Sequence, residues 1–219
     1  MLRRRPWSWF LAALIGGAPG ISPALAGAPG DGGETACFDA LDQLGVRYER
    51  ADRPGIAIGV KVQGTVGGVT YDAYDGSDLV LDCSLVYSLA RAGDVLREYG
   101  IERAVYSGSY QRRTIRNTGR TSSHSFGLAL DVHIYEGESL DRLRIEDDYE
   151  QGLGSADDCL GRPLTEGGAI LRDLHCRLEN AQLFRFILSP DYDAHHFNHF
   201  HLEAHPWTER DDLHPDHRD

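Results

Sequence analysis

Apolar and polar residues alternate in several short segments of the chain and recur at three- and four-residue steps in others. The alternation predicts strands, here over residues 56–62, 104–107, 128–134, 184–188 and 199–203. The helical spacing predicts helices over residues 35–44, 79–99 and 171–183. A glycine turn at Gly64 predicts that residues 64–73 form a hairpin with the first strand. We find no internal repeat and no second-domain boundary, so the pattern predicts one domain of helices and strands.

Three segments lack such a pattern. Residues 27–36 are rich in glycine and predict a flexible lead-in. Residues 136–168 are acidic and contain glycines, which indicates a long insertion. Residues 207–219 indicate a charged tail. The folded domain is therefore expected over residues 37–206.

The N-terminus has the pattern of an export signal. Arginines at positions 3–5 precede an apolar run over residues 7–17, which is too short to span a bilayer. Small residues up to Ala26 form a cleavage site, so we expect residues 1–26 to be a signal peptide. The protein would then be secreted or periplasmic, without a stable membrane anchor after cleavage. The alternative is an uncleaved membrane anchor.

Composition and charge narrow the class of partner. Of the 219 residues, 41% are hydrophobic and 26% are charged, which is typical of a globular protein. The formal net charge is −12. Nucleic acids and anionic membranes are themselves negative, so we expect neither as a general partner.

Four cysteines follow the export signal, and an exported protein is expected to use them in disulfides. Three pairings are possible, and we favour Cys37–Cys83 and Cys159–Cys176 because each closes a moderate loop. A zinc–cysteine site is the competing interpretation, but the sequence contains no C-x-x-C spacing to support it.

Two stretches indicate a metal site. SSHSFGLALDVH, residues 122–133, places His124 seven residues before Asp131, and a predicted strand near the C-terminus contains His201. Two imidazoles and one carboxylate form the ligand set of a hydrolytic zinc site, which leaves a fourth position for water. A zinc ion there would lower the pKa of that water and polarise a carbonyl. We therefore predict a Zn²⁺ site on His124, Asp131 and His201, with Gly127 at a tight bend between the first two.

Further polar residues lie close to the predicted ligands. The period of a strand places His199 on the same face as His201, where it could move a proton or stabilise an oxyanion. His196 is a second candidate at the same place. His133 shares the face of Asp131 and is either close to the metal or simply exposed. Asp191 and Asp193 are interpreted first as turn residues, and four other histidines as surface residues: His175, His205, His214 and His217.

A polar loop over residues 108–123 contains four arginines: Arg112, Arg113, Arg116 and Arg120. So many arginines in nine residues are unusual in an acidic protein. One of them could bind a substrate carboxylate through a bidentate contact. The alternative is a solvated basic loop.

The pattern S-x-H-x-x-G-x-A-x-D over residues 122–131, with H-x-H at 199–201, resembles the zinc metallopeptidase superfamily of D-Ala-D-Ala carboxypeptidases, lysostaphin-type peptidases and the hedgehog domain. GSYQRRTI and ILSPDYDAHHFNHFHLE resemble, more closely, the bacterial extensin-like C-terminal family. The resemblance covers about residues 37–203. It implies an α+β fold with a central antiparallel sheet and flanking helices, and zinc on the three residues named above.

The resemblance also implies roles for neighbouring residues. His199 would be the non-ligand histidine beside the metal, and His196 falls where penicillin-insensitive murein endopeptidases have another active-site histidine. Arg113 falls where carboxypeptidase relatives bind a substrate carboxylate, and we assign Ser122 of the first motif to substrate binding as well. Asn198 stands where the D-Ala-D-Ala branch has a glutamate base, so any base must be one of the two histidines.

A second departure is Arg112, which stands where the extensin-like pattern usually has a cysteine. The disulfides of that family are therefore not carried over to this chain as a whole.

These observations together predict a zinc-dependent peptidase that cleaves D-amino-acid amide bonds in the stem peptides of peptidoglycan. Because peptidoglycan is itself anionic, recognition would depend on the arginine loop rather than on overall attraction. The first alternative is a non-catalytic cell-wall binding module stabilised by its metal. The second is a disulfide-bonded structural protein without metal.

Overall fold

The computed structural model describes residues 31–116, 118–153 and 159–209. The predicted signal peptide, residues 1–26, and the end of the predicted tail, residues 210–219, lie outside this range. Within the described residues, no helix is both long enough and apolar enough to cross a membrane.

Among the described residues the strands form two sheets, and the larger one runs in the order β3-β4-β6-β7-β10-β9, with β8 paired to β7. Neighbouring strands are antiparallel except for the parallel pair β4 and β6. The predicted α+β fold with a central, mainly antiparallel sheet is therefore confirmed. The strands are β3 (Thr65–Val66), β4 (Val69–Ala73), β6 (Arg103–Gly108), β7 (Ala129–Gly137), β8 (Leu140–Arg144), β9 (Phe186–Leu188) and β10 (Phe200–Glu203).

The smaller sheet consists of β1 (Tyr48–Arg50), β2 (Gly59–Val62) and β5 (Val80–Asp82), in the order β1-β2-β5. The predicted hairpin between residues 56–62 and 64–73 is wrong, because β2 pairs with β1 and β5 instead. The hairpin here is β3–β4, in which Val66 pairs with Val69. The two residues between them are Gly67 and Gly68, both with positive φ, as a tight two-residue hairpin turn requires.

Four α-helices and two short 3₁₀ helices are seen in the described part of the chain: α1 (Asp31–Gln43), α2 (Cys83–Glu98), α3 (Ile145–Asp148), α4 (Glu166–Asn180), η1 (Ser123–Phe126) and η2 (Trp207–Glu209). The helix predicted over residues 79–99 begins only at Cys83, since the residues before it pair in β5. Asp82 caps this helix by accepting a hydrogen bond from the Ser84 backbone N–H. Helix α1 starts at Asp31, inside the segment predicted to be a flexible lead-in.

The expectation of a long insertion over residues 136–168 is wrong. Strand β7 continues to Gly137, and β8, α3 and the start of α4 occupy much of the remainder. The predicted tail is also partly folded, because Trp207 is buried and its ring meets Tyr87 of α2 edge-on at 5.3 Å. These residues are ordered by distant packing partners, which local patterning does not reveal.

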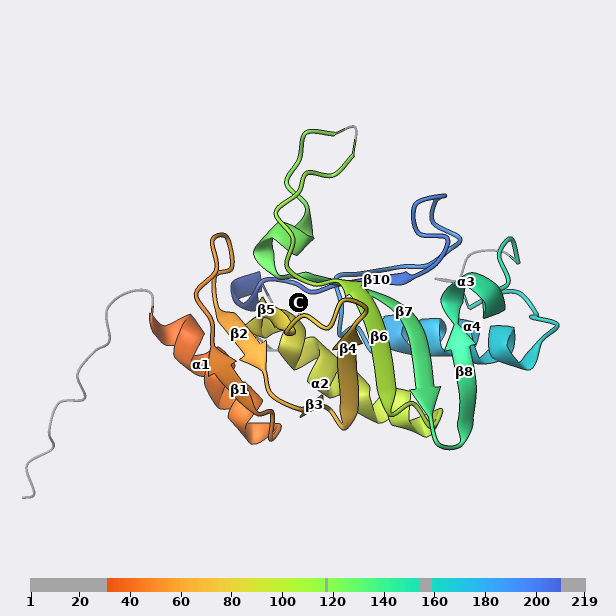
Figure 1. Ribbon diagram of the computed structural model, residues 1–219, viewed down its shortest axis with the longest axis horizontal. Helices are drawn as coiled ribbons and strands as arrows, with labels where there is room; N and C mark the ends of the chain where they lie inside the picture. Colours follow the sequence, from red (N-terminus) through yellow and green to blue (C-terminus); the bar gives the residue numbers. More distant parts are fainter. Residues whose placement is uncertain (1–30, 117, 154–158, 210–219) are drawn as a thin grey trace, which may run out of the picture.

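The core lies on one face of the large sheet, and the loops that carry the site lie at its edge. Helices α2 and α4 lie behind the strands in Figure 1. Phe200 of β10 is fully buried, and its ring packs edge-on against His175 of α4. The loops that precede η1 and β10 extend from the same edge of the sheet (Figure 1).

Both predicted disulfides are confirmed. Cys37–Cys83 joins α1 to the first turn of α2 across 46 residues of sequence. Cys159–Cys176 joins the segment before α4 to α4 itself, across 17 residues. No free cysteine remains among the described residues, which removes the basis for a zinc–cysteine site there.

Candidate metal centre

The register between β7 and β10 brings two of the predicted ligands together. Asp131 pairs with His201, so their side chains project from the same face of the sheet. The next pair along, Val132 and Phe200, is fully buried on the opposite face. The alternation predicted for these two strands is therefore confirmed.

The third predicted ligand comes from η1. Gly127, with φ of 65°, ends this short helix and turns the chain into β7. A Cβ atom at Gly127 would lie 2.7 Å from the backbone nitrogen of Asp82, so only glycine fits here without displacement. The tight bend predicted between His124 and Asp131 is confirmed.

His124, Asp131 and His201 converge closely enough to hold a metal ion. Asp131 Oδ1 lies 2.8 Å from His201 Nδ1 and 3.2 Å from His124 Nε2. The two imidazole nitrogens are 3.3 Å apart. All three ligand atoms lie within 4.8 Å of one another, and all three residues are buried. In the described part of the chain, this is the one group of histidine, cysteine and carboxylate side chains that meets that condition.

The surroundings of the histidines suit metal binding. His124 Nδ1 donates to the carbonyl oxygen of Ser109 at 3.0 Å, which leaves Nε2 as its ligand atom. His201 Nε2 lies 3.5 Å from Glu203 Oε2, and this carboxylate similarly orients Nδ1 toward Asp131. Glu203 was not predicted, although its place two residues after His201 on the same strand face is a signal that period-two counting could have used.

Gly108 allows the ligands to approach the end of β6. A Cβ atom there would lie 2.8 Å from Asp131 Oδ2 and 3.3 Å from His124 Cε1. The absence of a side chain therefore makes room for the two ligands. Neither Gly108 nor Ser109 was predicted, since a glycine or a backbone carbonyl gives no recognisable sequence signal of such a contact.

Arg113, predicted to bind a substrate carboxylate, lies at the edge of the centre. Its Nη2 is 3.3 Å from Asp131 Oδ2, and its side chain is 45% exposed. Ser122 is buried, and its backbone N–H donates to the carbonyl oxygen of Arg113 at 3.0 Å. Ser125 Oγ accepts from the Arg113 backbone N–H at 2.8 Å. These two serines thus attach the arginine loop to η1, and direct contact of Ser122 with a substrate stays a prediction.

His199 lies beside the three ligands, as expected. Its Nε2 is 3.4 Å from Asp131 Oδ1. Its Nδ1 donates to Asn198 Oδ1 at 2.9 Å, so Nε2 is the nitrogen with a lone pair on the side of the metal centre. Asn198 therefore orients the neighbouring histidine.

The ring of His196 lies next to that of His199 in a tilted arrangement. Their ring centroids are 5.1 Å apart, and the centroid of His201 is 5.8 Å from that of His196. His196 Nδ1 donates to Asp193 Oδ1 at 2.7 Å. Asp193 also accepts from the backbone N–H of His195, so it is a turn residue that orients a site histidine.

His133 is half-buried, and its ring lies beside that of His199. Its Nδ1 donates to the carbonyl oxygen of Asn198 at 2.8 Å, and its Nε2 accepts from Ser107 Oγ at 2.7 Å. Its ring centroid lies 5.2 Å from that of His199. Of the two alternatives considered for His133, the structure favours a supporting place near the metal centre.

The electrostatics of the centre are dominated by Asp131. Burial raises the pKa of its carboxyl, but the hydrogen bonds from His124 and His201 outweigh burial and hold this pKa well below its usual range. Burial lowers the pKa of His201, yet the hydrogen bonds with Asp131 and Glu203 raise it to about 9. Burial lowers the pKa of His199 to about 4, against the opposing pull of Asp131, so this imidazole is neutral at pH 7.

The prediction that His175 is a surface residue is wrong. It is fully buried in α4, and its Nε2 donates to the carbonyl oxygen of Ile187 at 3.1 Å. Its helix packs against the sheet at this point, which a single histidine in an amphipathic pattern does not show. His205 is partly exposed, and His214 and His217 lie outside the described residues.

Comparison with known proteins adds one finding. Neither the curated proteins nor the solved structures include a match to this chain. The family described as the extensin-like protein C-terminus matches residues 35–211. This range includes all three residues of the candidate metal centre and the buried Trp207. The chain therefore belongs to the extensin-like C-terminal family.

Proposed function

We propose that this protein is a secreted or periplasmic zinc-dependent peptidase that hydrolyses D-amino-acid amide bonds in the stem peptides of peptidoglycan. The observation that carries the proposal is the convergence of His124, Asp131 and His201, with His199 and His196 beside them. The N-terminal export pattern and the two disulfides support the location.

The donor set supports zinc as the metal. Two neutral imidazoles and one carboxylate match hydrolytic zinc sites, and both histidines are oriented by oxygen acceptors on their other ring nitrogens. When bound, zinc would act as a Lewis acid that activates water and polarises a carbonyl. The resemblance of the motifs to the D-Ala-D-Ala carboxypeptidase and lysostaphin-type superfamily supports the same reading.

The protein's own side chains would supply proton transfer and positioning. His199 is neutral at pH 7 and has the lone pair of Nε2 directed to the centre, so it is our candidate to accept a proton during hydrolysis. His196, held by Asp193, is the second candidate. The exposed guanidinium of Arg113 would hold a substrate carboxylate beside the reacting bond.

The alternative is a non-catalytic cell-wall binding module that keeps its metal for stability. Asn198 favours it, because this side chain cannot take a proton from water in the place where one branch of the superfamily has a glutamate. Its amide oxygen accepts a hydrogen bond from His199 instead. The three-residue ligand group favours the enzyme, because structural zinc sites usually have four protein ligands.

The test is cleavage of purified muropeptides, followed by chromatography and mass spectrometry. We expect cleavage that a chelator abolishes and added zinc restores, and that His124→Ala abolishes as well. His195→Ala is the matched control, because this histidine is exposed and lies outside the ligand group. If zinc binds at one equivalent but no muropeptide of any cross-link type is cleaved, the peptidase proposal is wrong and the binding module remains.

A further inference from the structure

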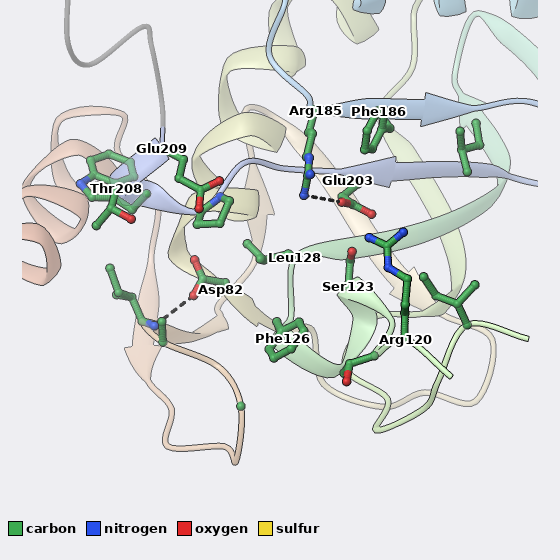
Figure 2. Close-up of a pocket in the computed structure, with 18 of the residues that line it drawn as sticks. Asp82, Arg120, Ser123, Phe126, Leu128, Arg185, Phe186, Glu203, Thr208 and Glu209 are labelled. Atoms are coloured by element: carbon green, nitrogen blue, oxygen red, sulfur yellow. Dashed lines mark hydrogen bonds and ion pairs between the residues drawn. The ribbon is translucent and has the colours of Figure 1, made fainter. Parts of the chain in front are cut away.

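A groove of about 840 Å³ lies between the arginine loop, β9 and η2 (Figure 2). Apolar side chains form much of its wall, among them Phe126, Leu128 and Phe186. Phe126 and Phe186 are 41% and 47% exposed, and with Tyr192 they gather in one groove, where grouped apolar side chains can meet a ligand. None of the three predicted metal ligands lines this groove.

The groove nevertheless shares its walls with the metal centre. Ser123 precedes His124 in η1, and Glu203 contacts His201 through the 3.5 Å approach to Nε2. On β9, Leu188 pairs with His201.

Tyr192 also contributes to the wall of the groove, and its ring centroid is 5.3 Å from that of His196. The wall of the groove therefore adjoins the residues of the candidate metal centre.

Two arginines face each other at the part of the groove closest to the centre. Figure 2 shows the side chains of Arg120 and Arg185 directed toward Glu203 from opposite sides. Arg185 Nη1 lies 3.4 Å from Glu203 Oε1, and its side chain is 44% exposed. Arg120 is exposed, and its guanidinium has no hydrogen bond or ion pair with any residue that the structure describes. The Glu203 carboxylate is thus engaged by Arg185 and by His201, and no described carboxylate pairs with the Arg120 guanidinium.

The other acidic residues of the groove do not balance this charge. Asp82 and Glu209 lie away from the two arginines, toward η2 (Figure 2). The carboxylate of Asp82 is already engaged, since it caps α2 and accepts from the Ile58 backbone N–H at 3.0 Å. In a chain of net charge −12, the arginine end is therefore a local positive site next to apolar walls.

We propose that this groove binds the carboxylate-bearing part of a substrate peptide, with Arg120 and Arg185 as its carboxylate contacts. The proposal rests on the peptidase function and adds a recognition site to it, for a peptide in which a free carboxylate adjoins apolar groups. Arg113 is separate from this contact, because it lies against Asp131 at the metal centre. Guanidinium groups suit the task, since they pair with carboxylates through two parallel hydrogen bonds.

The experiment measures binding rather than cleavage, so its outcome is independent of the peptidase test. Chelator-treated full-length protein is titrated calorimetrically with a peptidoglycan stem tetrapeptide that has free carboxylates, and with the same peptide amidated at every carboxylate. We expect the free peptide to bind at least about tenfold more tightly than the amide, because the amide cannot form the charge-assisted pairs. Equal binding of the two peptides, or no binding of either, would overturn the proposal.

Variants locate the contact. Arg120→Ala and Arg185→Ala should each weaken binding of the free peptide about five- to tenfold. Arg116→Ala is the matched control, because it removes the same charge from the same loop but lies outside the groove, and it should change nothing. Equal losses for Arg116→Ala and Arg120→Ala would mean general charge attraction and contradict the proposal. Unchanged thermal unfolding of each variant establishes that the loss is one of binding. If Arg120→Ala cleaves muropeptides with an unaltered KM, the groove proposal fails while the peptidase proposal stands.

Discussion

His201 Nδ1 lies 2.8 Å from Asp131 Oδ1, although 70 residues separate them in the chain. The pairing of β7 with β10 places them opposite each other, and η1 adds His124 from the loop that enters β7. A carboxylate held this close to two imidazoles costs desolvation free energy unless a proton or a metal ion shares the site. In the metal-free protein the proton on His201 shares this site, and a metal ion could take its place.

The first prediction concerns the space left by Gly108. Gly108→Ala would place a methyl group 2.8 Å from Asp131 Oδ2 and so move a ligand out of position. We expect zinc affinity about ten- to a hundredfold weaker, measured by competition with a chromogenic chelator. Gly32→Ala is the control, because no atom lies within 4 Å of the added Cβ and its φ is not positive. Equal zinc affinity in both variants would show that the ligands tolerate the methyl group.

The second prediction concerns pH and the metal. The pKa of His201 is raised to about 9 in the metal-free protein, so at pH 7 this imidazole carries a proton that zinc must displace. Zinc affinity should therefore rise with pH up to about 9. Calorimetry at pH 7 in two buffers of different ionisation enthalpy should show about one proton released per zinc ion. No release would mean that His201 is neutral before the metal binds.

The same shift affects the stability of the metal-free protein. The pKa of His201 in the folded state is higher than the roughly 6.5 of a free imidazole. Its interaction with Asp131 therefore contributes fully below pH 6.5 and is lost as pH rises through 9. Loss of this contribution should therefore lower the melting temperature of chelator-treated protein as the pH is raised from about 6.5 to 9. Zinc-loaded protein is the control, since metal replaces the proton and should remove most of that fall.

The third prediction separates metal binding from proton transfer. His199→Ala should keep zinc at one equivalent, because His199 lies outside the ligand group, yet lower kcat for muropeptide cleavage by about a hundredfold or more. Metal analysis and steady-state kinetics on the same preparation test both halves. His195→Ala, on the same loop but exposed, should retain activity. Loss of zinc from His199→Ala would instead make His199 a fourth ligand.

The fourth prediction concerns the C-terminal boundary of the domain. Trp207 is 8% exposed and packs against Tyr87, so Trp207→Ala should destabilise the fold by about 3–5 kcal/mol. Chemical unfolding measures the change. Leu164→Ala is the control, because this leucine is 93% exposed and its removal should leave stability unchanged. Equal stability of the two variants would support the earlier expectation of a tail beginning at residue 207.

Local patterning was a good guide where a residue's role follows from its immediate neighbours. Period-two alternation places His201 on the face of β10 opposite to the buried Phe200. Loop size predicts the Cys37–Cys83 and Cys159–Cys176 pairings. Local patterning failed where partners come from elsewhere. β2 joined β1 and β5 rather than residues 64–73, and His175 was buried by the sheet under α4.

The sequence by itself determined which residues could form a metal site: two histidines and an aspartate in specific motifs, with a glycine bend between the first two. Only the tertiary structure decided which groups surround them. Ser109 contacts His124 and Arg113 contacts Asp131, and both contacts join segments that are distant in sequence. The groove likewise brings Arg120 and Arg185 together from separate parts of the chain. Strand register and burial set such distances, and neither is encoded in the spacing of a single motif.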